Sequence, residues 1–167
     1  MARIVPCIRF MIPHDIEYAV AISYSSPLPW AADDFYQCIQ HKNCTGLVAE
    51  VGQQMVGFTI FEEQKAYISI LNMYVEEDMR RMGIGHAMVS KLKSKLTLNA
   101  CTAMFARVHE RDQGTLHFML SEDFYGVGVI NEYYDDDDAY EMRYQLPEFA
   151  QWAYFNRIAK TLAALEQ

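Results

Sequence analysis

One short segment of the sequence has the residue types and the spacing to bind an anion. It joins a strand-like stretch to a helix-like one and reads Arg80-Arg81-Met82-Gly83-Ile84-Gly85-His86-Ala87. The start of a helix has about four backbone N–H groups without partners inside the helix, and the helix dipole favours negative charge there. Glycines permit positive φ and close approach of the backbone, and the arginines add positive charge. The pattern predicts a diphosphate site, although a Gly-x-Gly turn can also simply connect two elements.

The overall charge limits the class of partner. The chain has 167 residues, with 14 Lys and Arg against 22 Asp and Glu, for a formal charge of −8. Such a balance repels phosphate backbones and argues against nucleic acid as the main partner, whereas it suits a cationic substrate such as an amine. No stretch approaches the ~20 apolar residues of a membrane span, and the N-terminus lacks the apolar run of a signal peptide. We therefore expect a cytoplasmic protein that does not act on membranes.

The cysteine and histidine pattern predicts no metal site. The cysteines form no C-x-x-C pair and no zinc-ligand spacing. They are Cys7, Cys38, Cys44 and Cys101. In a reducing compartment free buried thiols are expected, with a disulfide as the alternative. His109 and His117 have no third ligand at a suitable spacing, so ordinary surface or core roles are expected for both.

The elements that must hold the anion segment follow from hydrophobic periodicity. Strand-like stretches between residues 46 and 75 predict an antiparallel run, and residues 87–98 follow in helical period. The whole chain predicts the order β-α-α-β-β-β-α-β-α-β-β-α. This is an α/β fold with a mixed, mostly antiparallel central sheet flanked by helices. Residues 1–147 are expected to form the domain, and residues 148–167 an extra C-terminal helix packed on it, because amphipathic helices usually cover a core.

The anion segment also resembles a family motif. Read as Arg80-x-x-Gly83-x-Gly85, it is similar to the acetyl-CoA motif of the GNAT superfamily of N-acetyltransferases. The preceding strand, with acidic residues after it, resembles that family's cofactor strand. The resemblance implies a GNAT fold that binds acetyl-CoA, with the pantetheine arm along the strand and the pyrophosphate on the loop amides. The cofactor residues so implied are Met73, Tyr74, Val75, Arg80, Arg81, Met82, Gly83, Ile84, Gly85, His86, Ala87 and Asp112.

The wider match is nearest to the ribosomal-protein-alanine acetyltransferase branch and spans residues 3–147. Trp30 followed by Phe35 resembles a segment between the first helices of that branch, and Tyr133-Tyr134 resembles its terminal aromatic pair. The resemblance implies acetyl transfer to a primary amine, with a protein or peptide N-terminus as the expected acceptor. It also implies direct attack by the amine without a covalent enzyme intermediate, and substrate contacts from Trp30, Tyr133 and Tyr134.

The positions that supply acid and base in that branch hold other residue types here. The base glutamate falls on Arg107, the helix tyrosine on Met119, and a second base position of the superfamily on Ser69. An arginine accepts no proton at neutral pH, and a thioether donates none. Ser69, Tyr134 and Glu132 are the candidate catalytic substitutes, each with a packing or hydrogen-bonding role as the alternative. General acid–base catalysis is typically worth ~10²–10⁴-fold, so its loss slows an enzyme without abolishing transfer.

The sequence is also compatible with two other functions and with a homodimer. A small-molecule amine or polyamine acetyltransferase would use the acidic turn at residues 135–138 to select a cation. A coenzyme-A-binding pseudoenzyme, acting as a sensor or partner protein, would explain Arg107 and Met119. The apolar stripe of the last helix would also suit a homodimer.

Overall fold

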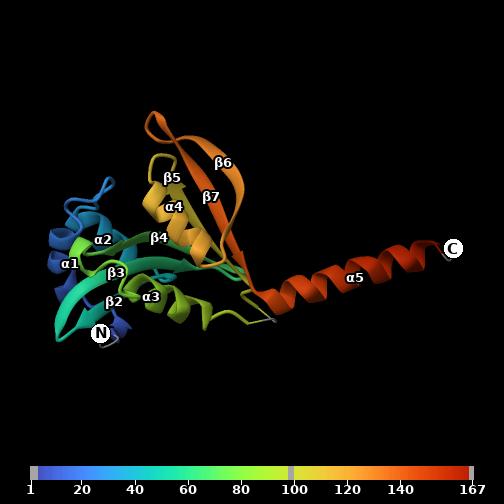
Figure 1. Cartoon of the computed structure of the whole chain (residues 1–167), viewed down its shortest axis with the longest axis horizontal. Coiled ribbons are helices and arrows are strands. Elements are labelled where there is room, and N and C mark those ends of the chain that lie inside the picture. The colour runs from blue at the N-terminus through green and yellow to red at the C-terminus, as the bar shows by residue number, and fades with distance from the viewer. Residues whose placement is uncertain (1–3, 98–99, 166–167) are drawn as a thin grey trace.

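The computed structural model of the chain describes residues 4–97 and 100–165, the last five by their backbone alone. The elements confirm the predicted order and the α/β class (Figure 1). In chain order they are β1 (Cys7–Phe10), the 3-10 helix η1 (Pro13–Asp15), α1 (Ile16–Ile22), α2 (Ala32–Gln40), β2 (Cys44–Val51), β3 (Gln54–Glu63), β4 (Tyr67–Val75), the 3-10 helix η2 (Glu77–Met79), α3 (Ile84–Lys93), β5 (Ala103–His109), α4 (Gln113–Ser121), β6 (Tyr125–Tyr134), β7 (Asp137–Gln145) and α5 (Pro147–Leu165).

The strands form one mixed, mostly antiparallel sheet, as predicted, and their order across the sheet is β1-β2-β3-β4-β5-β7-β6. The exception is the parallel pair of β4 and β5, which is joined only from Tyr67 opposite Ala103 to Ile70 opposite Ala106. On the other edge of β4, a bulge at Leu71 shifts the register with β3. Since a bulge bends and twists its strand, β4 can leave β5 at this point. The β6–β7 hairpin consequently stands away from the strands on the far side of β4 (Figure 1).

Helices cover both faces of the sheet. α1 and α2 pack on one face, where Ile16 and Phe35 lie in a cluster with Phe58. α3 and α4 pack on the other, where Leu92 and Met119 belong to the largest buried cluster. Both layers are possible because the central strand β3 is apolar and buried on its two faces. The end of β4 is therefore held between two helical layers.

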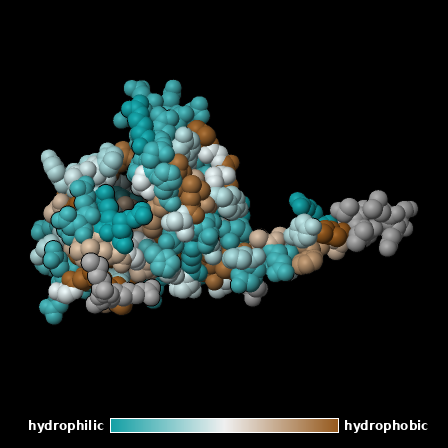
Figure 2. Space-filling view, viewed as in Figure 1, coloured by the Kyte–Doolittle hydropathy of each residue, from teal (hydrophilic) through white to brown (hydrophobic). Residues whose placement is uncertain are grey.

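The last helix begins where the sequence predicts, but its predicted packing on the domain is wrong. α5 projects from the body as a single long helix (Figures 1 and 2). Trp152 and Phe155 are 59% and 60% exposed. β7 ends at Gln145 and α5 begins at Pro147, so a single residue links them, which is shorter than the usual connection of about 2–6 residues between a strand and a helix that packs on it. None of the described helices has the apolar content, at sufficient length, to cross a membrane.

A disulfide joins Cys38 to Cys44, so the prediction of free thiols is wrong for this pair. α2 ends two residues after Cys38, and the tight turn into β2 brings the two Cα atoms to 5.8 Å, a separation that a disulfide can bridge. Cys7 and Cys101 are free thiols, as predicted, but the predicted burial is wrong for Cys7, which is exposed on the edge strand β1.

Candidate active site

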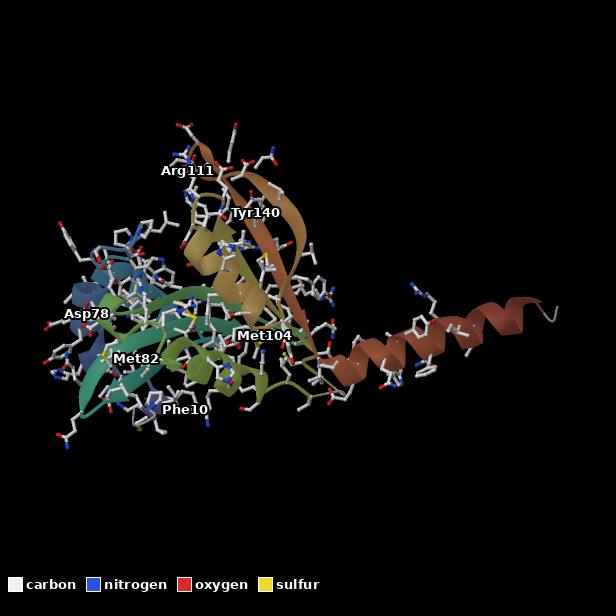
Figure 3. The ribbon with its side chains drawn as sticks, viewed as in Figure 1. Phe10, Asp78, Met82, Met104, Arg111 and Tyr140 are labelled. Atoms are coloured by element: carbon white, nitrogen blue, oxygen red, sulfur yellow. A yellow bond between two sulfur atoms is a disulfide. The ribbon has the colours of Figure 1, made fainter. Side chains whose placement is uncertain are left out.

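The loop before α3 presents unpaired backbone groups to solvent. Gly83 precedes the first turn of α3 with φ of +85°, and Arg81 also has positive φ, +65°. The first bond inside the helix runs from the Ala87 N–H to the Gly83 carbonyl oxygen, 2.9 Å away. No side chain in the described part of the chain caps this helix. The N–H groups of residues 84–86 therefore have no partner within it, and an anion would satisfy them. Figure 3 labels Met82 on this loop.

The two glycines of the motif have different roles. Gly83 supplies the left-handed backbone, and a Cβ there would meet nothing within 4 Å. Gly85 lies inside α3, and a Cβ there would come within 3.0 Å of the Phe118 ring on α4. The sequence assigns the space beside Gly85 to a ligand, but part of that space is filled by the Phe118 ring of α4. Only Gly83 needs to be glycine for the shape of the loop.

Arg80 braces the loop against β4. Its Nε donates to the Val75 carbonyl oxygen at 3.0 Å, and its guanidinium lies 5.3 Å from the centre of the Tyr74 ring. This side chain is therefore engaged with the protein, although its charge still adds to the positive potential of the loop. Arg81 is exposed next to it.

Two further residues of the implied cofactor set have structural partners for their side chains. The His86 Nδ1 lies 2.9 Å from a carboxylate oxygen of the buried Glu122, which ties α3 to the end of α4. Lys93 completes this link by donating to the Glu122 carbonyl oxygen at 2.8 Å. Asp112 caps α4, where its carboxylate accepts from the Thr115 N–H at 2.9 Å and from the Thr115 hydroxyl at 2.6 Å. Because the His86 imidazole bonds to Glu122, a ligand would meet this residue at its backbone N–H.

Near the end of β4, the backbone edge is more accessible to a ligand than the side chains are. Met73 packs toward α3, and Tyr74 is buried on the opposite face, with its hydroxyl 3.1 Å from the Ser25 hydroxyl. Because β4 pairs with β5 only as far as Ile70, the facing edge from residue 71 to residue 75 has no neighbouring strand. Backbone groups at such an edge can pair with an extended ligand.

A cavity of about 210 Å³ lies at the point where β4 and β5 part. It brings together Trp30, Ser69, Tyr133 and Tyr134, all of which the sequence singled out. Glu132 does not line it, because its side chain is exposed on the hairpin, where its N–H bonds to an Asp138 carboxylate oxygen at 2.8 Å. The lining residues are Trp30, Ser69, Ile70, Leu71, Phe105, Ala106, Arg107, Tyr133 and Tyr134.

Tyr134 places a protonated hydroxyl in this cavity. Burial raises the pKa of Tyr134 to about 12, so the hydroxyl keeps its proton at neutral pH. It donates to the Arg107 carbonyl oxygen over a long 3.3 Å, and its ring stacks on His109 with 5.1 Å between centroids. The group can therefore act as a hydrogen-bond donor, and it cannot act as a base.

Arg107 and Met119, which stand where the resembling branch has its base and acid, lie in different surroundings. Met119 is buried in the core beneath α4 and does not line the cavity. Arg107 does line it. Its Nη1 donates to the Tyr133 hydroxyl at 3.3 Å, and its Nη2 lies 3.8 Å from a Glu141 carboxylate oxygen.

The sequence reasoning missed Glu62. β3 continues to Glu63, and Glu62 pairs across the sheet with Ser69. Cross-strand partners have Cβ atoms about 4.5–5.5 Å apart on the same face, so this carboxylate lies beside the cavity wall. The alternation of Phe58, Ile60 and Glu62 was the signal that could have placed it there.

The acidic turn at residues 135–138 is partly neutralised by its neighbours. Asp137 lies 2.5 Å from the Arg111 guanidinium and 3.2 Å from the His109 Nε2. Because the His109 Nδ1 accepts from the Arg111 backbone N–H, the hydrogen of a neutral ring is on Nε2 and points to Asp137. Figure 3 shows Arg111 at the outer end of the hairpin. Over residues 4–97 and 100–165, the His, Cys, Asp and Glu side chains form no group of three or more that could hold a metal ion.

Comparison with known proteins places these features in context. Residues 14–124 match the model of the acetyltransferase (GNAT) family. No curated protein sequence gives a significant match.

Solved structures share the fold at low sequence identity. The ribosomal-protein-S18-alanine N-acetyltransferase from Escherichia coli superposes with a TM-score of 0.76 at 19% identity, over 85% of this chain and 94% of that chain. Ard1 from Thermoplasma volcanium gives 0.77 at 23% identity, over 84% and 97%. Arabidopsis thaliana NAA60, solved in complex with acetyl-CoA, gives 0.73 at 16% identity, over 84% and 99%. Identities this low establish a common fold, and the family match covers about two thirds of the chain.

Proposed function

This chain belongs to the acetyltransferase (GNAT) family, and we propose that it transfers the acetyl group of acetyl-CoA to the primary amine of a protein or peptide N-terminus. One observation carries the proposal. The edge of β4 at residues 71–75 has no neighbouring strand, with the Val75 carbonyl oxygen held by Arg80, and it runs from the cavity at the β4–β5 split to the loop of free N–H groups before α3. An extended molecule with an anionic end and a reactive end would fit this path.

The residues that would hold acetyl-CoA follow from that path. The N–H groups of residues 84–86 would bind the pyrophosphate, helped by the charge of Arg81. The edge of β4 would pair with the amides of the pantetheine arm, as a neighbouring strand would. Acetyl-CoA supplies an activated acetyl thioester, so the chain needs mainly to bring an amine to it, and orientation alone is worth roughly 7–11 kcal/mol in favourable cases.

The reaction is a direct displacement. The neutral amine nitrogen attacks the thioester carbonyl carbon, a C–N bond forms, the C–S bond breaks, and the nitrogen loses a proton. We assign the oxyanion to a backbone N–H near Val75 on β4. We assign the hydrogen bond to the departing sulfur to the Tyr134 hydroxyl, since this group is protonated and lines the cavity. Ser69 and its cross-strand neighbour Glu62 are the assigned path for the amine proton.

Calorimetric titration with acetyl-CoA, followed by mass detection of acetylated peptides, tests the proposal. Gly83→Val forces a branched side chain into φ of +85° and shifts the loop amides, so affinity should fall at least about tenfold. Gly52→Val is the matched control, because Gly52 also has positive φ and open space around its Cβ but lies in the β2–β3 turn. Equal affinity for acetyl-CoA in the wild type and in Gly83→Val would contradict the assigned pyrophosphate site.

Two alternatives have distinct signatures. A small-molecule amine acetyltransferase would acetylate polyamines faster than peptides. The partial neutralisation of Asp137 by Arg111 weakens its selection of cations. A coenzyme-A-binding pseudoenzyme would bind acetyl-CoA tightly and acetylate neither class.

The proposed homodimer would use the exposed apolar stripe of α5. Sedimentation of the wild type and of Trp152→Ser would show it as a difference in mass.

A further inference from the structure

The guanidinium of Arg107 forms part of the wall of the acceptor cavity. It stands on β5 where β4 has already left, on the sheet face that also carries Phe105 and Ser69. Ser69 pairs with Phe105, and Arg107 is two residues farther along β5. At about 3.3 Å of rise per residue, the Arg107 position of β5 lies roughly 6.6 Å along the strand from the row that holds Ser69 and Phe105.

The donors of Arg107 are only partly used. An arginine has five N–H donors, and a strong guanidinium–carboxylate bond is about 2.7–2.9 Å long. Here the contact with the Tyr133 hydroxyl is 3.3 Å and that with the Glu141 carboxylate is 3.8 Å. The guanidinium also lies 5.1 Å from the centre of the Tyr133 ring, which orients it and consumes no further donor. The group is therefore positioned and still able to bind an anion.

The charges around this wall are positive on balance. Arg143 lies over the Phe105 ring, 5.4 Å from its centre, and Glu141 is the cross-strand partner of Arg107. Two arginines and one carboxylate thus share this face of β5 and β7, and of the three Arg107 lines the cavity. Glu62 lies at the other side, across the sheet from Ser69. The positive charge of Arg107 is therefore part of the cavity lining, whereas the negative charge of Glu62 lies behind Ser69, outside the lining.

We infer that Arg107 is a specificity-determining residue that binds a carboxylate of the acceptor, so that the preferred substrates carry an acidic group close to the reacting amine. The inference rests on the proposed function and narrows its substrate class. The amine lies toward Ser69 and Glu62, and the carboxylate lies toward Arg107. The side-chain carboxylate of an N-terminal Asp or Glu and the α-carboxylate of a free amino acid share this chemistry.

The test measures kcat and KM for matched acceptors at saturating acetyl-CoA. Peptides that begin with Asp or Glu are compared with otherwise identical peptides that begin with Asn or Gln, and free alanine is compared with alaninamide. The wild type should prefer the Asp peptide over the Asn peptide by about 10- to 100-fold in kcat/KM, as expected for hydrogen bonds to a charged group. Arg107→Gln should bring this ratio close to one, mainly through KM, and Arg107→Lys should restore part of it.

Arg111→Gln is the matched control, since Arg111 is an exposed arginine in the loop that follows β5 and does not line the cavity. It should keep the wild-type preference. A wild type without preference, or a preference that survives in Arg107→Gln, would overturn the inference while leaving acetyl transfer intact. A preference of the wild type for alanine over alaninamide, without one for Asp over Asn, would assign the subsite to free amino acids.

A second measurement does not depend on turnover. Acetyl-Asp and acetyl-Asn peptides are titrated into the protein saturated with coenzyme A. Tighter binding of the acidic product, lost in Arg107→Gln, supports the inference even if no acceptor is turned over. Equal binding of the two products by the wild type overturns it. Failure of acetyl-CoA itself to bind would instead contradict the proposed function.

Discussion

Replacing Tyr134 by phenylalanine removes one hydroxyl from the cavity and leaves the ring in place. The ring is held by stacking on His109, with 5.1 Å between centroids, and by an edge contact with Tyr133 at 4.8 Å. The only described bond of the hydroxyl, to the Arg107 carbonyl oxygen, is 3.3 Å long. A hydrogen bond in a folded protein contributes about 0.5–1.5 kcal/mol, so the free energy of unfolding should fall by about 1 kcal/mol or less.

The effect on catalysis should be larger. Because its pKa is about 12, the hydroxyl is protonated at the pH of the assay and can donate to the sulfur as negative charge develops there. A hydrogen bond to a charged group is worth about 1.5–3 kcal/mol, which corresponds to roughly 10- to 100-fold in rate. The expected result of Tyr134→Phe is a fall of this size in kcat, with little change in KM.

The assay follows release of the free thiol of coenzyme A with the best peptide acceptor. Tyr125→Phe is the control, since Tyr125 is an exposed tyrosine of the same strand outside the cavity. A kcat for Tyr134→Phe within twofold of the wild type would refute the assignment of this hydroxyl. Alkaline unfolding gives an independent check. A tyrosine whose folded pKa is raised stabilises the fold below its ordinary pKa near 10, and this contribution is lost as the pH rises toward 12.

Three further substitutions test the fold that carries the site. Asp15→Asn should lower the free energy of unfolding by about 2–3 kcal/mol in urea titrations, because the buried carboxylate accepts two bonds from Arg9 at 2.7 and 2.8 Å. Arg9 holds the pKa of Asp15 below its usual value, so this stabilisation is complete above about pH 4 and is lost as the pH falls further. Gly85→Leu should cost about 1–3 kcal/mol by pushing on the Phe118 ring, and an unchanged urea midpoint would contradict the close approach of α3 and α4. Trp152→Ala should change the melting temperature little, since the side chain is 59% exposed, whereas a loss above about 2 kcal/mol would mean that α5 packs on the body.

The anion loop could be predicted from the sequence because its determinants are local. A helix start exposes its N–H groups wherever the chain places it, and Gly83 permits the left-handed turn without help from distant residues. The same holds for the order of helices and strands, which follows from hydrophobic periods of 3.6 and 2. The disulfide could not be predicted in this way, because it depends on how closely a turn brings Cys38 to Cys44.

The cavity was decided only by the tertiary structure. Ser69, Arg107 and Tyr134 come from strands far apart in the chain, and they meet because the bulge at Leu71 and the end of the β4–β5 pairing open the sheet at one point. Spacing along a sequence does not encode where two strands part, since that depends on twist and packing over the whole sheet. The position of α5 was equally beyond the sequence. Its amphipathic pattern predicts an apolar face, but only the tertiary structure shows that this face is exposed, with Trp152 and Phe155 in solvent.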